Sequence, residues 1–166
     1  MPHSFVLIGL PGVGKTTIGK LLSNTLDCPF VDTDDLIEQK MNCSISEIFA
    51  KYGEEYFRQI ETSVIKDLSA NVSQIVAIGG GAFQKEENRQ SLQQLGKIVY
   101  LKASPDGVFE RLKEDSSRPL LQCSSPFEKI KELYHKRKDA FELADMIIDT
   151  TDLSVQEVLE KILRLV

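Results

Sequence analysis

Short hydrophobic runs alternate with stretches of helical periodicity along the chain. The runs are as short as buried strands, and between them hydrophobic residues recur every three or four positions. This alternation predicts βαβ units joined by right-handed crossovers. The expected fold is α/β, with three α/β/α layers built on a five-stranded parallel sheet. The expected strands cover residues 5–8, 28–31, 75–78, 97–101 and 146–148.

The expected helices fill the segments between these strands. Ser44 and Glu47 have the spacing of a capping box, and a longer helix is expected from Gly53 to about residue 70. A polar loop over residues 114–125 precedes a helix expected at 126–143, and we expect this loop to be mobile. Four residues of the closing helix are expected to face inward: Val155, Val158, Leu159 and Ile162.

Length and charge narrow the class of protein. The 166 residues are expected to form one domain, and 42% hydrophobic content is typical of a globular chain. The formal net charge of -5 disfavours a nucleic-acid or anionic-membrane partner. Neither a signal peptide nor a membrane span is expected at the N-terminus, because its apolar run ends after six residues at Pro11.

The cysteines and histidines show no metal-binding spacing. Cys28, Cys43 and Cys123 are odd in number and form no CxxC pair, and His3 and His135 have no partner at ligand spacing. The cysteines are therefore interpreted as free thiols in a reducing compartment, and a cytoplasmic enzyme is expected.

A glycine-rich turn follows the first expected strand. The residues from Gly9 to Thr16 match the pattern G-x-x-x-x-G-K-[ST], whose backbone N–H groups surround phosphates. Lys15 would add a positive charge and Thr16 a hydroxyl for Mg²⁺, and the helix that begins here would point its positive end at the anion. A turn that merely links strand to helix is the weaker reading, because a buried strand precedes the motif and an amphipathic helix follows it.

Three acids follow the second expected strand. Asp32 and Asp34 are two residues apart, so in an extended segment both would face one side and would need a cation such as Mg²⁺. The alternative is a helix N-cap, a role that Asp35 or Thr33 is expected to fill, which leaves the other two acids for function. Gly79, Gly80 and Gly81 end the third strand and would admit a ligand to the backbone, although a glycine run alone also makes tight turns.

Two arginines are candidate anion-binding residues. Arg137 falls in the hydrophobic stripe of the helix expected at 126–143, so it lies either at the edge of that stripe or in a pocket. Arg58 is three residues before Glu61, and spacing alone leaves a surface ion pair and a binding role equally open. Because Glu128 and Glu132 interrupt the basic residues of 128–138, this segment is not interpreted as a nucleic-acid surface.

Together these motifs resemble those of the shikimate kinase family. The match runs collinearly over nearly the whole chain. It comprises Gly-Leu-Pro-Gly-Val-Gly-Lys-Thr-Thr at 9–17, Asp-Thr-Asp at 32–34, Ile48-Phe49, Gly53-Glu54, Phe-Arg-x-x-Glu at 57–61, Gly-Gly-Gly-Ala at 79–82, Arg-Pro-Leu-Leu at 118–121 and Tyr134-x-x-Arg137. The resemblance implies a P-loop kinase fold, related to nucleoside monophosphate kinases, with substrate-binding helices at about 33–61 and a mobile lid at about 112–125. It also implies ATP-dependent phosphorylation of the 3-hydroxyl of shikimate, in the pathway to chorismate and the aromatic amino acids.

The resemblance further implies a role for each matching residue. Lys15, Asp34 and Arg118 would be catalytic, with Asp34 on the acceptor hydroxyl and Arg118 closing over the phosphate. Thr16 and Asp32 would hold Mg²⁺. ATP would contact Gly12, Val13, Gly14, Lys15, Thr16, Thr17, Arg111 and Arg118, with Arg111 against adenine. Shikimate would contact Asp34, Phe49, Phe57, Arg58, Gly79, Gly80, Gly81 and Arg137, the two arginines on its carboxylate.

One departure and several alternatives accompany this hypothesis. Many family members carry a hydroxyl residue just before the triple glycine, where this chain has Val76-Ala77-Ile78, so this strand lacks the hydroxyl that would help the metal through a water molecule. A gluconate or nucleoside monophosphate kinase of similar fold is the nearest alternative, and a nucleotide-binding module without catalysis is another. No Asn-Lys-x-Asp motif supports a guanine-nucleotide switch. The expected partners are ATP and shikimate, and the chain is expected to be a monomer.

Overall fold

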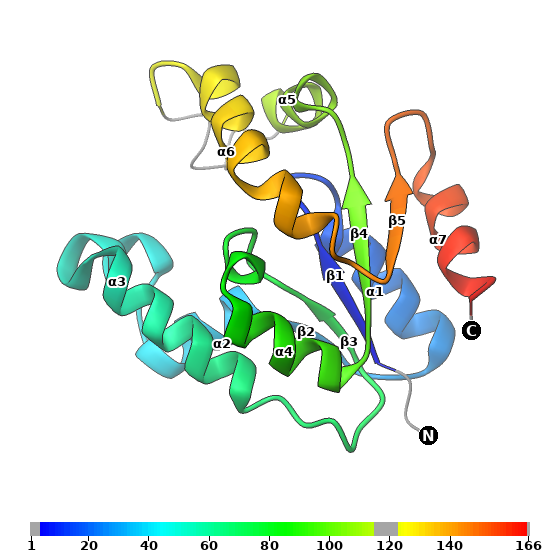
Figure 1. Ribbon diagram of the computed structural model, residues 1–166, viewed down its shortest axis with the longest axis horizontal. Helices are drawn as coiled ribbons and strands as arrows, with labels where there is room; N and C mark the ends of the chain where they lie inside the picture. The colour runs from blue at the N-terminus through cyan, green and yellow to red at the C-terminus, as the bar shows by residue number, and fades with distance from the viewer. Residues whose placement is uncertain (1–3, 115–122, 166) are drawn as a thin grey trace.

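The computed structural model describes residues 4–114 and 123–165. Its five parallel strands lie in the order β2-β3-β1-β4-β5, which confirms the predicted sheet (Figure 1). Strands β2, β3 and β1 are parallel neighbours, so their carboxyl ends lie side by side. The segments that follow these three strands therefore meet at one end of the sheet. The strands are β1 Phe5–Ile8, β2 Phe30–Asp32, β3 Ile75–Ala77, β4 Lys97–Lys102 and β5 Met146–Asp149.

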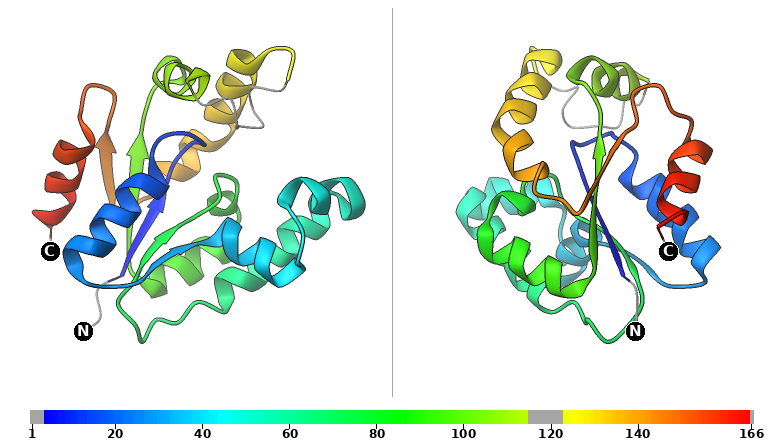
Figure 2. Two further views of the ribbon diagram at one scale, coloured as in Figure 1. Left: turned by 180° about the vertical axis from the view of Figure 1, so that it is seen from behind. Right: turned by 45° about the vertical axis from the view of Figure 1, so that its right-hand side comes forward.

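Helices cover both faces of this sheet, as three α/β/α layers require. Figure 2 shows α1 and α7 on one side of the strands and α3, α4 and α6 on the other. The central strands are therefore buried on both faces and hydrophobic throughout, and Val6, Leu7 and Ile98 have no exposed surface. The helices of the described residues are α1 Lys15–Leu26, α2 Thr33–Met41, α3 Ile45–Lys66, α4 Glu86–Leu95, α5 Pro105–Lys113, α6 Pro126–Phe141 and α7 Val155–Leu163, with a 3-10 turn, η1, at Ala82–Gln84.

Helix α3 has the two parts that the sequence predicts. Ser44 is its N-cap and forms a capping box with Glu47. Gly53, inside the helix, has φ 83° and ψ 174°. This positive φ breaks the helix and favours glycine. The helix ends at Lys66 rather than near residue 70, because Asp67 caps it and the Ser69 hydroxyl accepts from the backbone N–H of Asn71 in a local turn.

Two further predictions about elements are corrected. Strand β2 begins at Phe30 rather than at Cys28, because Pro29 has no N–H to donate and contributes only its carbonyl, which accepts from Ile75. Val155 is 45% exposed rather than inward, since it is the first residue after the Ser154 N-cap. The other three residues predicted to face inward on α7 are buried.

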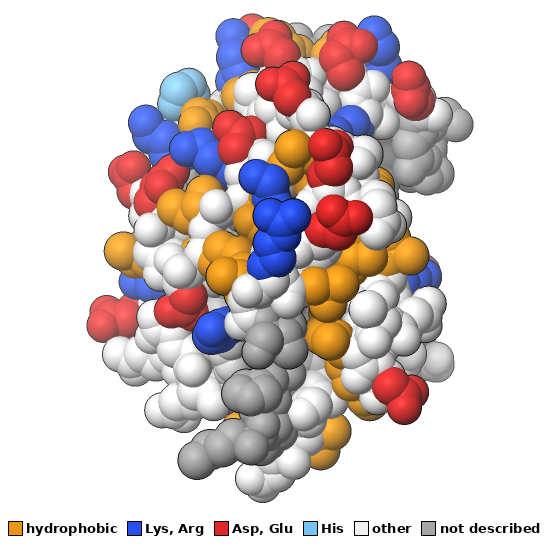
Figure 3. Space-filling view, turned by 90° about the vertical axis from the view of Figure 1, so that its right-hand side faces the viewer, with side chains coloured by type: hydrophobic (Ala, Val, Ile, Leu, Met, Phe, Trp, Pro, Cys, Tyr) orange, Lys and Arg blue, Asp and Glu red, His pale blue; other side chains and the backbone are white. Residues whose placement is uncertain are grey.

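The β5 edge forms one side of the molecule. Ile147 on β5 and Leu143 just before it are exposed, and Figure 3 shows hydrophobic side chains on this side among charged side chains of both signs. Within the described ranges, no helix is both long and apolar enough to cross a lipid bilayer. Residues 115–122 of the predicted lid, including Arg118, lie outside the described residues.

Candidate active site

The turn between β1 and α1 forms a pocket of about 150 Å³ at the sheet edge. Gly14 is the N-cap of α1 with φ 104°, and no side chain occupies the cap, so the first N–H groups of the helix remain available to an anion. Gly12 has φ 81°, and a Cβ there would lie 2.5 Å from the side chain of Leu112. The turn therefore requires glycine at both positions.

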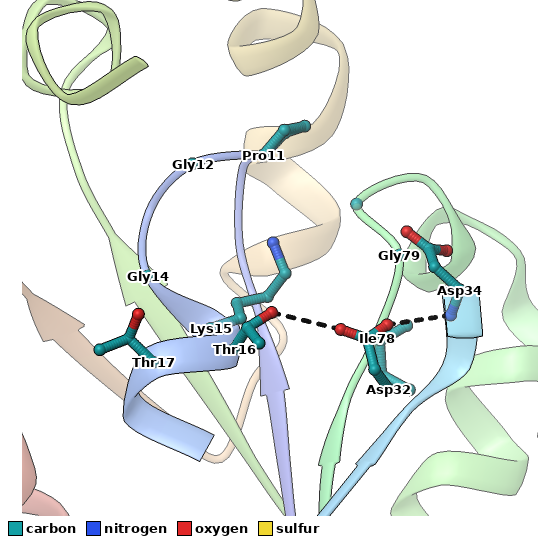
Figure 4. Close-up of a pocket in the computed structure, with 11 residues that line it drawn as sticks. Pro11, Gly12, Gly14, Lys15, Thr16, Thr17, Asp32, Asp34, Ile78 and Gly79 are labelled. Carbon is teal, nitrogen blue, oxygen red and sulfur yellow. Dashed lines mark hydrogen bonds between the residues drawn. The ribbon is translucent and has the colours of Figure 1, made fainter. Parts of the chain in front are cut away.

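Lys15 extends into this pocket from the first residue of α1 (Figure 4). Its Nζ donates to the carbonyl oxygens of Gly9 at 2.9 Å and Leu10 at 3.0 Å. Five of the predicted ATP contacts and both predicted acids line the pocket, whereas Val13 and Arg111 line a separate cavity behind it. The lining residues are Pro11, Gly12, Gly14, Lys15, Thr16, Thr17, Asp32, Asp34, Ile78, Gly79 and Gly80. One cation and the start of a helix thus face two carboxylates across the same space.

Asp32 is bound by both of its carboxylate oxygens. Oδ2 accepts from the Thr16 hydroxyl at 3.2 Å, and Oδ1 accepts from the backbone N–H of Asp34 at 3.0 Å (Figure 4). Asp32 is therefore itself the N-cap of α2, a role that the sequence led us to expect from Asp35 or Thr33. Asp34 also lies in the first turn of α2 rather than in an extended segment, because the helix begins directly after β2.

Thr33 has a role that sequence reasoning missed. Its fully buried hydroxyl donates to the carbonyl of Ala77 and accepts from the backbone N–H of Gly79 at 3.1 Å, which joins α2 to the end of β3. The end of β3 has no hydroxyl of its own: the residue before the triple glycine is Ile78, which lines the phosphate pocket. The signal was the position of Thr33 between Asp32, the last residue of β2, and Asp34.

The Asp34 carboxyl has a pKa that is raised toward neutral pH. Burial raises its pKa to about 6, and the charges of Asp32 and Glu61 act in the same direction, while Lys15 opposes them. A carboxyl with a raised pKa beside a phosphate pocket is suited to exchange a proton with a ligand hydroxyl.

A second and larger cavity, of about 540 Å³, adjoins the phosphate pocket. The two cavities share Pro11, Asp34, Gly79 and Gly80 in their walls. The larger one lies between α3, α6 and the triple glycine, so Asp34 stands where the two compartments meet. It brings together Asp34, Phe49, Phe57, Arg58, Gly79, Gly80, Gly81 and Arg137, all predicted to contact the second substrate.

Arg58 lines this cavity and forms the ion pair with Glu61 that its spacing indicated, but its partner is buried. Its Nη1 donates to Glu61 at 2.8 Å, and Glu61 is only 1% exposed. The Nη2 of Arg58 also donates to the exposed Glu54 at 3.5 Å. Burial raises the pKa of Glu61, and the neighbouring guanidinium of Arg58 opposes this shift. The buried carboxylate therefore holds Arg58 beside Gly81, where a Cβ would lie 2.5 Å from the guanidinium.

Arg137 reaches the same cavity from α6. It is 9% exposed, its Nε has no hydrogen-bond partner among the described residues, and a Cβ on Gly80 would lie 2.6 Å from its Nη1. Burial lowers the pKa of Arg137, with Arg58 acting in the same direction. A buried cation with an unpartnered N–H, beside a second cation, favours an anionic ligand such as a carboxylate.

Two aromatic rings complete one wall of the cavity. The ring centroids of Phe49 and Phe57 are 4.6 Å apart. Phe57 is 4% exposed and packs with Ile37 and Ile48 in a small separate core, whereas Phe49 is 37% exposed. The pair offers an apolar surface opposite the charged groups. Seven further polar residues line this cavity without having been predicted as site residues: Ser46, Glu54, Glu61, Gln84, Lys129, Glu132 and Lys136.

Arg111 lies at a third cavity, of about 300 Å³, behind the phosphate turn. Its Nη1 donates to the carbonyl of Val13 at 3.1 Å and its Nη2 to that of Thr150 at 2.9 Å. The guanidinium therefore connects the phosphate turn to the segment after β5. Its position between these two segments is compatible with the predicted contact to a nucleotide base.

Thr16 and Asp32 fit a magnesium site that phosphate completes. No group of three or more His, Cys, Asp or Glu side chains that could hold a metal is found in residues 4–114 and 123–165. Mg²⁺, however, is commonly held by one or two protein oxygens together with substrate phosphates and water. The Thr16 hydroxyl and Asp32 carboxylate, 3.2 Å apart at the wall of the phosphate pocket, are suitable oxygen donors.

Comparison with known proteins identifies the family of this chain. The family model of shikimate kinase matches residues 11–166. The chain is 47% identical over 161 residues to the shikimate kinase of Thermodesulfovibrio yellowstonii, a match that covers 97% of this chain and 93% of that protein.

Solved structures give the same result. The chain matches shikimate kinase from Acinetobacter baumannii in complex with shikimate with a TM-score of 0.91 and 36% identity, over 99% of this chain and 93% of that one. A Janibacter sugar kinase matches with a TM-score of 0.69 at 16% identity, over 99% and 94% of the two chains, and shows a shared fold alone. By its sequence and by its fold, this chain belongs to the shikimate kinase family.

Proposed function

We propose that this protein is a shikimate kinase, which transfers the γ-phosphoryl group of ATP to the 3-hydroxyl of shikimate. The observation that carries the proposal is the arrangement of the two cavities. A phosphate pocket opens into a compartment with two arginines on its wall, and Asp34 stands at the junction. Phosphoryl transfer depends mainly on positioning and charge neutralisation, and this arrangement provides both.

The donor side consists of the phosphate turn and the start of α1. The backbone N–H groups from Gly12 to Thr17 and the Lys15 ammonium bind the β- and γ-phosphates of ATP. Arg111 lies against the adenine, and Arg118 of the lid approaches the transferring phosphate. Closure of a lid over residues 112–125 would exclude water and limit hydrolysis of ATP.

Thr16 and Asp32 hold Mg²⁺ on this side of the site. The ion, when bound, neutralises charge on the phosphate oxygens. The chain contributes the two oxygen donors, and the hydrogen bond from the Asp34 N–H to Asp32 fixes the orientation of that carboxylate.

The acceptor side binds shikimate by its carboxylate and its ring. Arg58 and Arg137 bind the carboxylate, and Phe49 and Phe57 pack against the carbon ring. The backbone of Gly79, Gly80 and Gly81 contacts the substrate where no side chain intervenes. Asp34 accepts a hydrogen bond from the 3-hydroxyl and takes its proton as the new O–P bond forms and the bond from the γ-phosphorus to the bridging oxygen breaks, with ADP as the leaving group. We further propose that the enzyme acts as a cytoplasmic monomer without nucleic-acid or membrane partners.

The proposed function is tested by a coupled assay of ADP release from MgATP. We expect turnover when shikimate is added, and at most background turnover with gluconate or AMP, because neither acceptor places a carboxylate and a hydroxyl as shikimate does. Omission of Mg²⁺ in the presence of EDTA is expected to abolish turnover. Equal rates with gluconate or AMP, or none with shikimate, would contradict the proposal.

Arg58→Ala is expected to raise the KM for shikimate by about tenfold to a hundredfold, with a smaller effect on the KM for ATP. A charge-assisted hydrogen bond to a carboxylate is worth about 1.5–3 kcal/mol, and Arg58 would make this bond on the acceptor side only. The measurement is steady-state kinetics with each substrate varied in turn.

Two further variants separate the loss of shikimate binding from the cost of leaving a buried charge unpaired. Arg58→Ala leaves the Glu61 carboxylate buried without its ion-pair partner, so the double variant Arg58→Ala/Glu61→Gln removes that charge as well. Arg164→Ala, at an exposed arginine after α7, is the matched control and should leave both KM values unchanged. A normal shikimate KM in the double variant would assign Arg58 a structural role.

A further inference from the structure

The turn that carries the triple glycine is held by side chains of α4. Within the turn, the backbone N–H of Ala82 donates to Gly79 and that of Gln84 donates to Gly81. The next three carbonyls each accept a side-chain hydrogen bond. Asn88 Nδ2 donates to Ala82 at 2.9 Å, and Arg89 Nη1 donates to Phe83 at 3.0 Å and to Gln84 at 2.6 Å.

One nitrogen of Arg89 therefore fixes two successive carbonyls at the end of η1. Both bonds are charge-assisted and part-buried, so they are among the stronger contacts that a side chain makes to backbone. Glycine has no side chain that packing could hold and is conformationally free. The Thr33 hydroxyl holds the N–H of Gly79 at the near end of the turn, so the positions of Gly80 and Gly81 depend on the residues that follow. Arg89 fixes those residues at the far end of the turn.

The position of this turn matters to both arginines of the acceptor cavity. Gly80 lies against the guanidinium of Arg137, and Gly81 lies against that of Arg58. The side chain of Gln84 donates in addition to the carbonyl of Lys136, the residue before Arg137. Gln84 thus accepts from Arg89 through its backbone carbonyl and donates to α6 through its side-chain amide.

We propose that Arg89 is a positioning residue for the acceptor substrate. It touches neither cavity of the site and acts through η1, which sets the glycine turn and, through Gln84, the position of Arg137. The proposal rests on the proposed function, because the ligand of this compartment is taken to be shikimate.

The test is the variant Arg89→Met, which keeps most of the aliphatic stem and removes both hydrogen bonds. We expect the KM for shikimate to rise by about tenfold, the loss of about 1.4 kcal/mol. The KM for ATP should change by less than about twofold, because the hydrogen bonds of Arg89 within the described residues go to η1 and not to the phosphate turn. Isothermal titration calorimetry with shikimate alone should show the same weakening without nucleotide.

A conservative variant and a control sharpen the test. Because one nitrogen of Arg89 makes both bonds, the single ammonium of Arg89→Lys can replace it, and we expect this variant to recover most of the affinity for shikimate. Gln93→Met changes an exposed residue one turn further along α4 and should leave both KM values unchanged. Thermal unfolding of each variant measures the change in stability separately.

Several results would overturn the inference. These are an unchanged shikimate KM in Arg89→Met, equal losses in the Met and Lys variants, or a parallel rise in both KM values with a lower Tm. The last result would indicate that Arg89 only stabilises the fold. Absence of shikimate-dependent turnover in the unmutated protein would instead contradict the proposed function, so the two failures are distinguishable.

Discussion

Replacing Asp34 by asparagine is expected to lower kcat by about 10²–10⁴-fold, the usual contribution of a positioned general base. The amide has the shape of the carboxylate but cannot take a proton, and Asp34 is the ionisable group at the junction of the two cavities. The KM for ATP should change far less, because Asp34 faces the acceptor. Steady-state kinetics of Asp34→Asn and of the control Asp35→Asn, an exposed acid of the same helical turn, measures this difference.

The same substitution is expected to make the unliganded protein more stable. The pKa of Asp34 in the folded protein is raised from 3.8 to about 6, so the folded state holds its proton more tightly than the unfolded chain does. The wild-type protein therefore loses stability as the pH rises from about 4 to about 6, and asparagine avoids that loss. At about 1.4 kcal/mol per pKa unit, the gain above pH 6 is at most about 3 kcal/mol.

Thermal unfolding in EDTA across this pH range tests the expected gain in stability. An Asp34→Asn protein that is less stable than wild type above pH 6 would contradict the burial-driven pKa shift. A variant that keeps more than a tenth of the wild-type kcat would contradict the role of Asp34 as the base. The two outcomes are independent, because one concerns the unliganded fold and the other the reaction.

Replacing Lys15 by methionine is expected to lower kcat/KM for ATP by about 10³-fold, near the upper end for loss of one preorganised donor. Charge builds up on the phosphate oxygens in the transition state, and Lys15 is the cation at the first turn of α1 that extends into the phosphate pocket. Methionine keeps the length of the side chain without the charge. Lys20→Met, an exposed lysine of the same helix, is the matched control.

Two measurements show whether the loss is electrostatic. Lys15 donates to the carbonyls of Gly9 and Leu10, so Lys15→Met is expected to reduce stability by about 1 kcal/mol for each bond, which thermal unfolding would detect. Lys15→Arg keeps the charge in a larger, planar group that the turn does not fit, and it should remain strongly impaired. Near-normal kcat/KM in the methionine variant would remove Lys15 from the proposed mechanism.

The donor side was predictable because its residues are neighbours in sequence. The turn from Gly9 to Thr16 is contiguous, and the physics of phosphate binding prescribes glycines, a lysine and a hydroxyl at fixed spacing. Asp32 and Asp34 follow a strand in a pattern that also indicates their edge of the sheet. Their local roles differed from expectation: Asp32 caps α2, and Asp34 lies in the first turn of that helix. The sequence could not show this, because the position of a cap depends on the backbone angles at one residue.

The acceptor side depends on contacts between distant segments. Spacing left Arg58 open between a surface pair and a binding role, and the burial of Glu61 beneath the glycine turn is the tertiary fact that favours the binding role. Thr33 and Gly79 are 46 residues apart, and Gln84 and Lys136 are 52 apart. No local pattern predicts such pairs.

The sequence alone determined the strands and helices through the periodicity of buried and exposed positions, and the phosphate turn through the contiguous motif from Gly9 to Thr16, because each of these depends on neighbouring residues. The strand order β2-β3-β1-β4-β5 was decided only in the tertiary structure. That order brings the ends of β1, β2 and β3 together and so determines which arginines face the same cavity as Asp34. The physical reason is that burial and electrostatic pairing arise only when segments far apart in the chain pack together.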